Sequence, residues 1–113
     1  MKTFKFAETS VFLHDEDLPD LLDHTNEIGV DTETTGLNLS RDRLCLIQIG
    51  ISRNECHLVK FDKSEFQKEG KYKNLVNLLN NKKIKKIFHY ARFDLAVIKK
   101  FLKINCENIF CTK

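Results

Sequence analysis

The sequence predicts one α/β domain built on a mixed β-sheet with helices on its faces. Its 113 residues leave room for a single domain. Three strand-like segments follow one another through short connections, and strand, helix, strand units come after them. Hairpins make antiparallel pairs, whereas a crossover through a helix adds a parallel strand. The predicted sheet therefore contains both kinds of pairing.

The N-terminal part supplies the first elements. A short strand is expected at residues 10–14, followed by a helix at residues 18–24 that has the only proline in its first turn. The segment at residues 28–33 alternates as a strand does and ends at a turn. We expect this segment to be the central strand.

The next two strands form a hairpin. Residues 44–51 are almost continuously apolar, which is typical of a strand covered on both faces. A polar turn at residues 52–54 separates them from a further strand at residues 55–61. The expected pairing is therefore antiparallel.

The C-terminal part changes to helical periodicity. Apolar residues recur at helical spacing from Tyr72 to Leu79, before an Asn-Asn stop. A strand is then expected at residues 82–89, a helix at 91–103 and a last strand at 108–111.

Two acidic side chains, Asp31 and Glu33, stand near the end of the central strand. Alternate strand residues point to the same face, so these carboxylates project side by side while Val30 points into the packing. Adjacent like charges cost free energy unless a cation lies between them, and Mg²⁺ or Mn²⁺ takes carboxylate oxygens. The alternative is a strand end at which both acids are solvated.

A third acid, Asp94, falls inside the apolar stripe of the helix at residues 91–103. A carboxylate on a packing face needs a partner. The simpler interpretation is a local cap or a salt bridge to a lysine or arginine. Because Asp31 and Glu33 belong to a neighbouring strand under the same layer, we interpret the three acids as a metal site.

The composition is that of a globular protein, with 42% hydrophobic and 31% charged residues. No apolar segment approaches the ~20 residues that cross a bilayer, and the first residues lack the apolar core of a signal peptide, so we expect a cytoplasmic protein without a membrane partner. The four cysteines lack CxxC spacing and are interpreted as reduced packing residues. A zinc site at Cys56 and His57 has no second half at ligand spacing. The net charge of +3 permits a phosphate-rich partner without demanding one.

Two segments resemble the first and second motifs of the DEDD superfamily of 3'-5' exonucleases, which have a ribonuclease H-like fold. The first is Asp31-Thr-Glu-Thr-Thr-Gly-Leu37 and the second is Phe88-His-Tyr-Ala-Arg-Phe-Asp-Leu95. Proofreading domains of DNA polymerases often carry an asparagine four residues before the aspartate, where this chain has Tyr90. The histidine one position earlier, His89, is similar to ribonuclease D-like members.

The resemblance implies that Asp31, Glu33 and Asp94 are the catalytic residues and the ligands of two divalent metal ions, Mg²⁺ or Mn²⁺. Metal ions in such a site activate a water for in-line attack on the terminal phosphodiester and stabilise the leaving 3' oxygen. The implied substrates are the 3' ends of single-stranded RNA, with DNA as the alternative.

Three further residues are implied to bind substrate: Thr34, Leu37 and His89. Thr34, with the turn after Glu33, is similar to the element that meets the terminal nucleotide, and Leu37 to the apolar wedge that separates the last bases. Without the resemblance, a threonine-glycine turn and a packed leucine explain Thr34 and Leu37 equally well.

The third motif of the family, a tyrosine or histidine shortly before a fourth aspartate, has no counterpart, because no aspartate follows Asp94. We therefore expect residues 1–113 to be a single exonuclease domain that is C-terminally incomplete and lacks its last helices. Weak activity and self-association through an uncovered sheet face around Leu46, Ile47 and Ile49 are expected as a result.

The competing hypothesis is a catalytically inactive nucleic-acid-binding or scaffold fragment. Clustered lysines would then hold phosphates through contacts that do not depend on sequence. Their simpler interpretation is a solvated face. These lysines are Lys82, Lys83, Lys85, Lys86, Lys99, Lys100 and Lys103.

Overall fold

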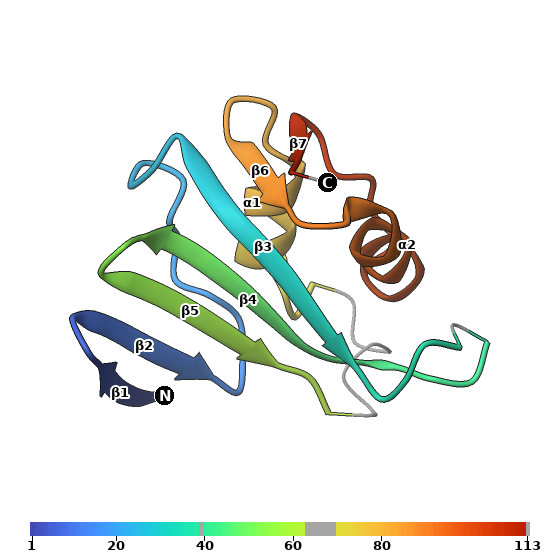
Figure 1. Ribbon diagram of the computed structural model, residues 1–113, viewed down its shortest axis with the longest axis horizontal. Helices are drawn as coiled ribbons and strands as arrows, with labels where there is room; N and C mark the ends of the chain where they lie inside the picture. Colours follow the sequence, from blue (N-terminus) through green and yellow to red (C-terminus); the bar gives the residue numbers. More distant parts are fainter. Residues whose placement is uncertain (39, 63–69, 113) are drawn as a thin grey trace.

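The computed structural model describes residues 1–38, 40–62 and 70–112. Its strands form one seven-stranded sheet in the order β1-β2-β5-β4-β3-β6-β7 (Figure 1). The elements are β1 (Lys2–Phe6), β2 (Thr9–His14), β3 (Glu27–Thr34), β4 (Leu44–Ser52), β5 (Glu55–Lys60), α1 (Lys73–Asn80), β6 (Lys85–Phe88), α2 (Ala91–Leu102) and β7 (Ile109–Cys111). The mixed α/β architecture predicted from the sequence is confirmed.

The sheet combines antiparallel and parallel pairs. β3, β4 and β5 are antiparallel neighbours, which confirms the hairpin. β6 pairs parallel with β3, β7 pairs parallel with β6, and β2 pairs parallel with β5. β1, which the sequence did not indicate, extends the sheet beyond β2, and all of its residues are exposed. β3 thus lies between the hairpin strands and the parallel strands.

The helix expected at residues 18–24 is wrong, because turns and irregular chain occupy this segment. Leu18 is buried in the common core, which anchors the segment without helical periodicity. The Asp17 carboxylate accepts hydrogen bonds from the backbone N–H groups of Asn74 (2.7 Å) and Leu75 (3.0 Å). Asp17, which directly precedes the expected helix, therefore caps α1, which lies far away in the sequence.

The core lies against the face of the sheet to which Val30 of β3 points. Val30 faces Ile49 across the β3–β4 pair, and Ile47 and Ile49 are both 0% exposed. The expectation that these two isoleucines are uncovered is therefore wrong, whereas Leu46, on the other face, is half-buried. Both helices contribute to this core, through Leu75, Leu78 and Leu79 of α1 and Val97 and Ile98 of α2.

The strand expected at residues 82–89 is shorter and contains a buried lysine. Lys86 is 0% exposed, and its Nζ donates to the backbone carbonyls of Asn81 and Glu107, the latter at 2.8 Å. Burial lowers the pKa of Lys86. Lys86 therefore holds two loops together and cannot lie on a solvated or phosphate-binding face.

No helix within residues 1–38, 40–62 and 70–112 is long and apolar enough to cross a membrane.

Candidate active site

The alternation of β3 determines where the first two acids point. Asp31 and Glu33 are exposed on the outward face, while Thr32 between them is buried on the core face. Their cross-strand neighbours on β4 are Gln48 and Leu46, so the pairing brings no positive charge opposite either acid. The β3–β4 pairing therefore leaves both acids exposed on the same face of β3, as the alternation of the strand predicts.

Asp94 lies in the first turn of α2 and is 5% exposed. The Asp94 carboxylate accepts a hydrogen bond from the Thr32 hydroxyl of β3. Its partner is therefore a strand residue, and the simpler interpretation as a local cap or a salt bridge is wrong. Burial raises the pKa of the Asp94 carboxyl, the Thr32 hydrogen bond opposes this, and the charges of Asp31 and Glu33 raise it further. The three acids therefore influence one another across the β3–α2 contact.

The start of α2 is positioned by its neighbours. Tyr90, immediately before the helix, has a left-handed backbone with φ of 57°, an uncommon conformation for a residue with a side chain. The N–H of Ala91 donates to the Cys111 sulfur of β7 at 3.3 Å. This sharp turn from β6 into α2 lets His89 and Asp94 line the same hollow. Sequence reasoning did not find Tyr90 or Cys111, because neither carries a local signal for a left-handed turn.

One hollow of about 340 Å³ brings the sequence-predicted residues together. Both the three acids and the three residues expected to bind substrate line it, with Tyr90 and Phe93 beside them. The six predicted residues in this lining are Asp31, Glu33, Thr34, Leu37, His89 and Asp94.

The loop after β3 exposes Leu37 to solvent. Leu37 is 83% exposed, so the interpretation as a packed leucine is wrong. The Thr34 hydroxyl donates to the Gly36 carbonyl at 2.5 Å, as a threonine-glycine turn requires. Phe93 is partly buried against the core and also lines the hollow. An apolar side chain thus projects at the edge of the acid cluster.

His89 is held by Thr112, a residue that sequence reasoning missed. The Thr112 hydroxyl lies 3.2 Å from the Phe88 carbonyl, to which it donates, and 3.0 Å from Nδ1 of His89. With its one hydrogen directed at the Phe88 carbonyl, the Thr112 hydroxyl accepts from Nδ1–H of His89, and in this tautomer of the neutral ring Nε2 is a hydrogen-bond acceptor. Only the pairing of β7 with β6 brings Thr112 to this place.

Comparison with known proteins identifies the family. The family model for 3'-5' exonucleases matches residues 11–113. The chain belongs to this exonuclease family. A search of the curated proteins finds no match.

Solved nuclease structures share the fold of this exonuclease. Brucella melitensis NrnC bound to pGG is 38% identical in sequence, with a TM-score of 0.82. The match covers 95% of this chain and 50% of the NrnC chain. The same NrnC with bound Mg²⁺ is 38% identical with a TM-score of 0.80, over 91% of this chain and 50% of its own. The catalytic core of RRP6 from Trypanosoma brucei, at 21% identity and a TM-score of 0.71, covers 97% of this chain and 31% of its own and shows the fold alone. This exonuclease chain therefore spans about half the length of the NrnC chains, and its resemblance to DEDD exonucleases of ribonuclease H-like fold is confirmed.

The donor chemistry of the exonuclease site suits a hard divalent cation. Three carboxylates around one hollow are the oxygen ligands that Mg²⁺ and Mn²⁺ prefer. As the side chains lie, no three His, Cys, Asp or Glu residues in the described ranges are close enough together to hold an ion. Mg²⁺ keeps several waters and takes phosphate oxygens, so the carboxylates need to supply only part of its ligands.

The lysine clusters of the exonuclease lie away from this site. Lys85 pairs with Glu27 at the first residue of β3, whereas Asp31 and Glu33 lie toward the other end of this strand. Lys99 and Lys100 are in the last turn of α2, and Asp94 is in the first. No lysine is among the described residues that line the hollow.

Proposed function

We propose that this exonuclease removes nucleotides from the 3' ends of single-stranded RNA in a reaction that depends on Mg²⁺ or Mn²⁺. One observation supports the proposal more than any other: acids suited to a divalent cation and residues suited to a nucleotide line the same hollow. Because the chain spans about half the length of the NrnC chains, the activity of the whole protein is part of the proposal.

In this proposal Asp31 and Glu33 hold the ions, and Asp94 joins them directly or through water. When bound, divalent ions polarise the phosphodiester and lower the pKa of water. The protein itself fixes the relative positions of the acids, because Thr32 ties Asp94 of α2 to the strand that carries the other two. Fixed carboxylates need no reorganisation when substrate arrives.

The terminal nucleotide is bound by residues around the acids. Leu37 offers an exposed apolar contact to the last base, and Phe93 offers an aromatic surface in the same hollow. His89 accepts a hydrogen bond through Nε2 from the 2'-hydroxyl of the terminal sugar. RNA has a 2'-hydroxyl that DNA lacks, which favours RNA as the substrate. The NrnC structure that holds pGG supports a short nucleic acid as the ligand.

The alternative proposal is a catalytically inactive nucleic-acid-binding or scaffold protein. The observation that favours it is that the acids in the described part of the chain do not by themselves converge on one ion position. Two observations weaken this alternative. Lys86 is buried, and Lys85 pairs with the end of β3 that lies away from the acids, so neither lysine can hold a phosphate in the hollow.

A release assay separates the two proposals. A short 5'-labelled RNA and the matching DNA are incubated with Mg²⁺, with Mn²⁺ or with a chelator. We expect stepwise shortening from the 3' end, release of mononucleotides, a faster rate on RNA and no shortening with the chelator. Asp31→Asn is the matched control, because it keeps the side-chain shape and removes the charge. Binding without shortening, unchanged by Asp31→Asn, would support the scaffold.

Two further proposals concern context. We propose a cytoplasmic location, which the four cysteines support because none of them forms a disulfide in the described residues, and disulfides are rare in the cytoplasm. We also propose self-association through the outward sheet face, where Leu46 and Leu58 are half-buried. Leu46→Lys should then lower the mass measured by light scattering, and an unchanged monomeric mass in both proteins would contradict it.

A further inference from the structure

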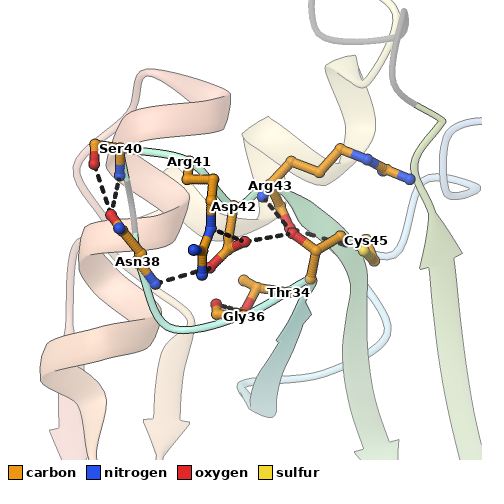
Figure 2. Close-up of polar contacts among 9 residues, drawn as sticks. Thr34, Gly36, Asn38, Ser40, Arg41, Asp42, Arg43 and Cys45 are labelled. Atoms are coloured by element: carbon orange, nitrogen blue, oxygen red, sulfur yellow. Dashed lines mark hydrogen bonds and ion pairs between the residues drawn. The ribbon is translucent and has the colours of Figure 1, made fainter.

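A buried carboxylate lies inside the surface loop that joins β3 to β4. Asp42 is 9% exposed, and Figure 2 shows its side chain among the polar contacts of this loop. Its Oδ2 accepts from the backbone N–H of Asn38 at 2.9 Å, and its Oδ1 accepts from the Thr35 hydroxyl at 3.3 Å. The N–H of Asp42 donates in turn to the Asn38 carbonyl at 2.7 Å. One side chain therefore connects both sides of the loop.

The charge of Asp42 is stabilised locally. Hydrogen bonds from the Arg41 side chain and from the Asn38 N–H lower the pKa of the Asp42 carboxyl. Ionised acceptors form stronger hydrogen bonds than neutral ones. The Arg41 side chain is 75% exposed, and exposed ion pairs contribute little to stability. The bonds from Asn38 and Thr35 are therefore the ones through which the carboxylate holds the backbone around Gly36.

Gly36 lies directly against this carboxylate. A Cβ at Gly36 would fall on the Asp42 side chain, so glycine is required here for close approach. The Gly36 carbonyl accepts the Thr34 hydroxyl, and Leu37 follows. The carboxylate thus supports the backbone immediately before the exposed leucine of the hollow.

Leu37 cannot be positioned by packing, because it is 83% exposed. Its place at the hollow depends on the backbone that carries it. We propose that Asp42 is a positioning residue of the exonuclease site, whose carboxylate fixes the backbone beside Gly36 so that Leu37 meets the terminal base. This inference rests on the proposed function, and Asp42 itself does not contact substrate.

The first test is kinetic. Asp42→Asn preserves shape but loses the charge, so we expect KM for a short RNA to rise about tenfold while kcat changes less than about threefold. In a Leu37→Ala background the same substitution should change KM less than about twofold, because it acts through Leu37. If Asp42→Asn raises KM by the same factor in the wild-type and Leu37→Ala backgrounds, or leaves KM unchanged, the proposal is overturned.

The second test needs no activity. Amide hydrogen exchange at Asn38, measured on the whole chain without substrate, should become at least about tenfold faster in Asp42→Asn. The matched control is Asp17→Asn, which weakens the cap of α1, lowers the unfolding midpoint and leaves KM unchanged. If the wild-type protein releases no nucleotides, the proposed function is wrong. The exchange rate at Asn38 still shows whether the Asp42 carboxylate fixes the backbone of the loop. Unchanged exchange would overturn that role at any level of activity.

Discussion

Two clusters of ionisable side chains lie at the edge of the core. One is the pair of His14 on β2 and His57 on β5, and the other is the group of acids on β3 and α2. Within the histidine pair the ring nitrogens meet hydrogen-bond partners from the chain itself. His14 Nε2 lies 2.8 Å from His57 Nδ1, and His57 Nε2 lies 2.6 Å from a Glu55 oxygen. Both nitrogens of His57 are therefore engaged, which leaves none for the zinc site considered from the sequence. This chain of donors and acceptors needs no ligand.

The acid cluster has the opposite electrostatics. Asp31, Glu33 and Asp94 carry the same sign, and the charges of Asp31 and Glu33 raise the pKa of the Asp94 carboxyl. A protein retains such an arrangement at a cost in stability when something outside the chain completes it. The comparison shows that complementary partners satisfy the histidine pair within the chain, whereas like charges around one hollow leave the acids suited to a ligand from outside it.

The largest expected effect breaks the acid cluster. Asp31→Asn or Glu33→Gln should lower the rate of nucleotide release at least about a hundredfold, because each removes a charge that holds the cation. The same variants should unfold at an unchanged or higher temperature without divalent ions, because one repulsion is gone. Release assays and thermal melts in chelator measure both. A lower melting temperature would show that the acids are structural partners.

The histidine pair should respond in the reverse way. His57→Ala leaves His14 without its partner, and an unsatisfied buried polar group costs about 1–3 kcal/mol. We therefore expect a lower free energy of unfolding by denaturant and an unchanged rate of nucleotide release per folded molecule. If His57→Ala abolishes nucleotide release and leaves the free energy of unfolding unchanged, the histidine pair serves the reaction and is not a structural pair.

The same comparison shows what the sequence could and could not predict. Alternation in residues 28–33 and the helical stripe around Asp94 are local patterns, so the strand, the helix and the three acids were predictable. The pairing of His14 with His57 depends on the register of β2 on β5, which no local pattern specifies.

Long-range contacts also explain the errors. Asp17 has the local signature of a helix start, yet its hydrogen bonds go to α1. Lys86 belongs to a run of lysines in the sequence. The carbonyls that accept from its Nζ belong to Asn81, in the loop before β6, and to Glu107, in the loop before β7. Position 86 therefore resembles a solvated lysine in sequence, and only the fold distinguishes it from Lys85.

Acid should destabilise the protein through the histidine pair. Burial lowers the pKa of His14, His57 and the N-terminal amine lower it further, and Asp17 opposes them. The unfolded chain then binds more protons than the folded one below the ordinary value of 6.5, so stability falls as the pH falls through that value. The slope is at most ~1.4 kcal/mol per pH unit for one proton.

Denaturant titrations between neutral and mildly acidic pH measure this slope. His14→Gln, which cannot titrate, should make it smaller. An equal slope in wild type and His14→Gln would assign the acid sensitivity to other groups.

The smallest expected effect concerns the pair of His89 and Thr112 beside the acid site. Thr112 accepts from Nδ1–H of His89, which keeps Nε2 available as an acceptor. Thr112→Val removes that acceptor, so the imidazole can take the other tautomer and present a donor instead. The net loss of one such hydrogen bond is about 1 kcal/mol, and KM for RNA should rise about fivefold. KM for the matching DNA should stay the same, because DNA lacks the 2'-hydroxyl that Nε2 accepts. Parallel kinetics on the two oligonucleotides give the answer directly. If KM rises equally for RNA and DNA, then Thr112 supports the backbone at the end of β6 through its bond to Phe88, and His89 does not read the sugar.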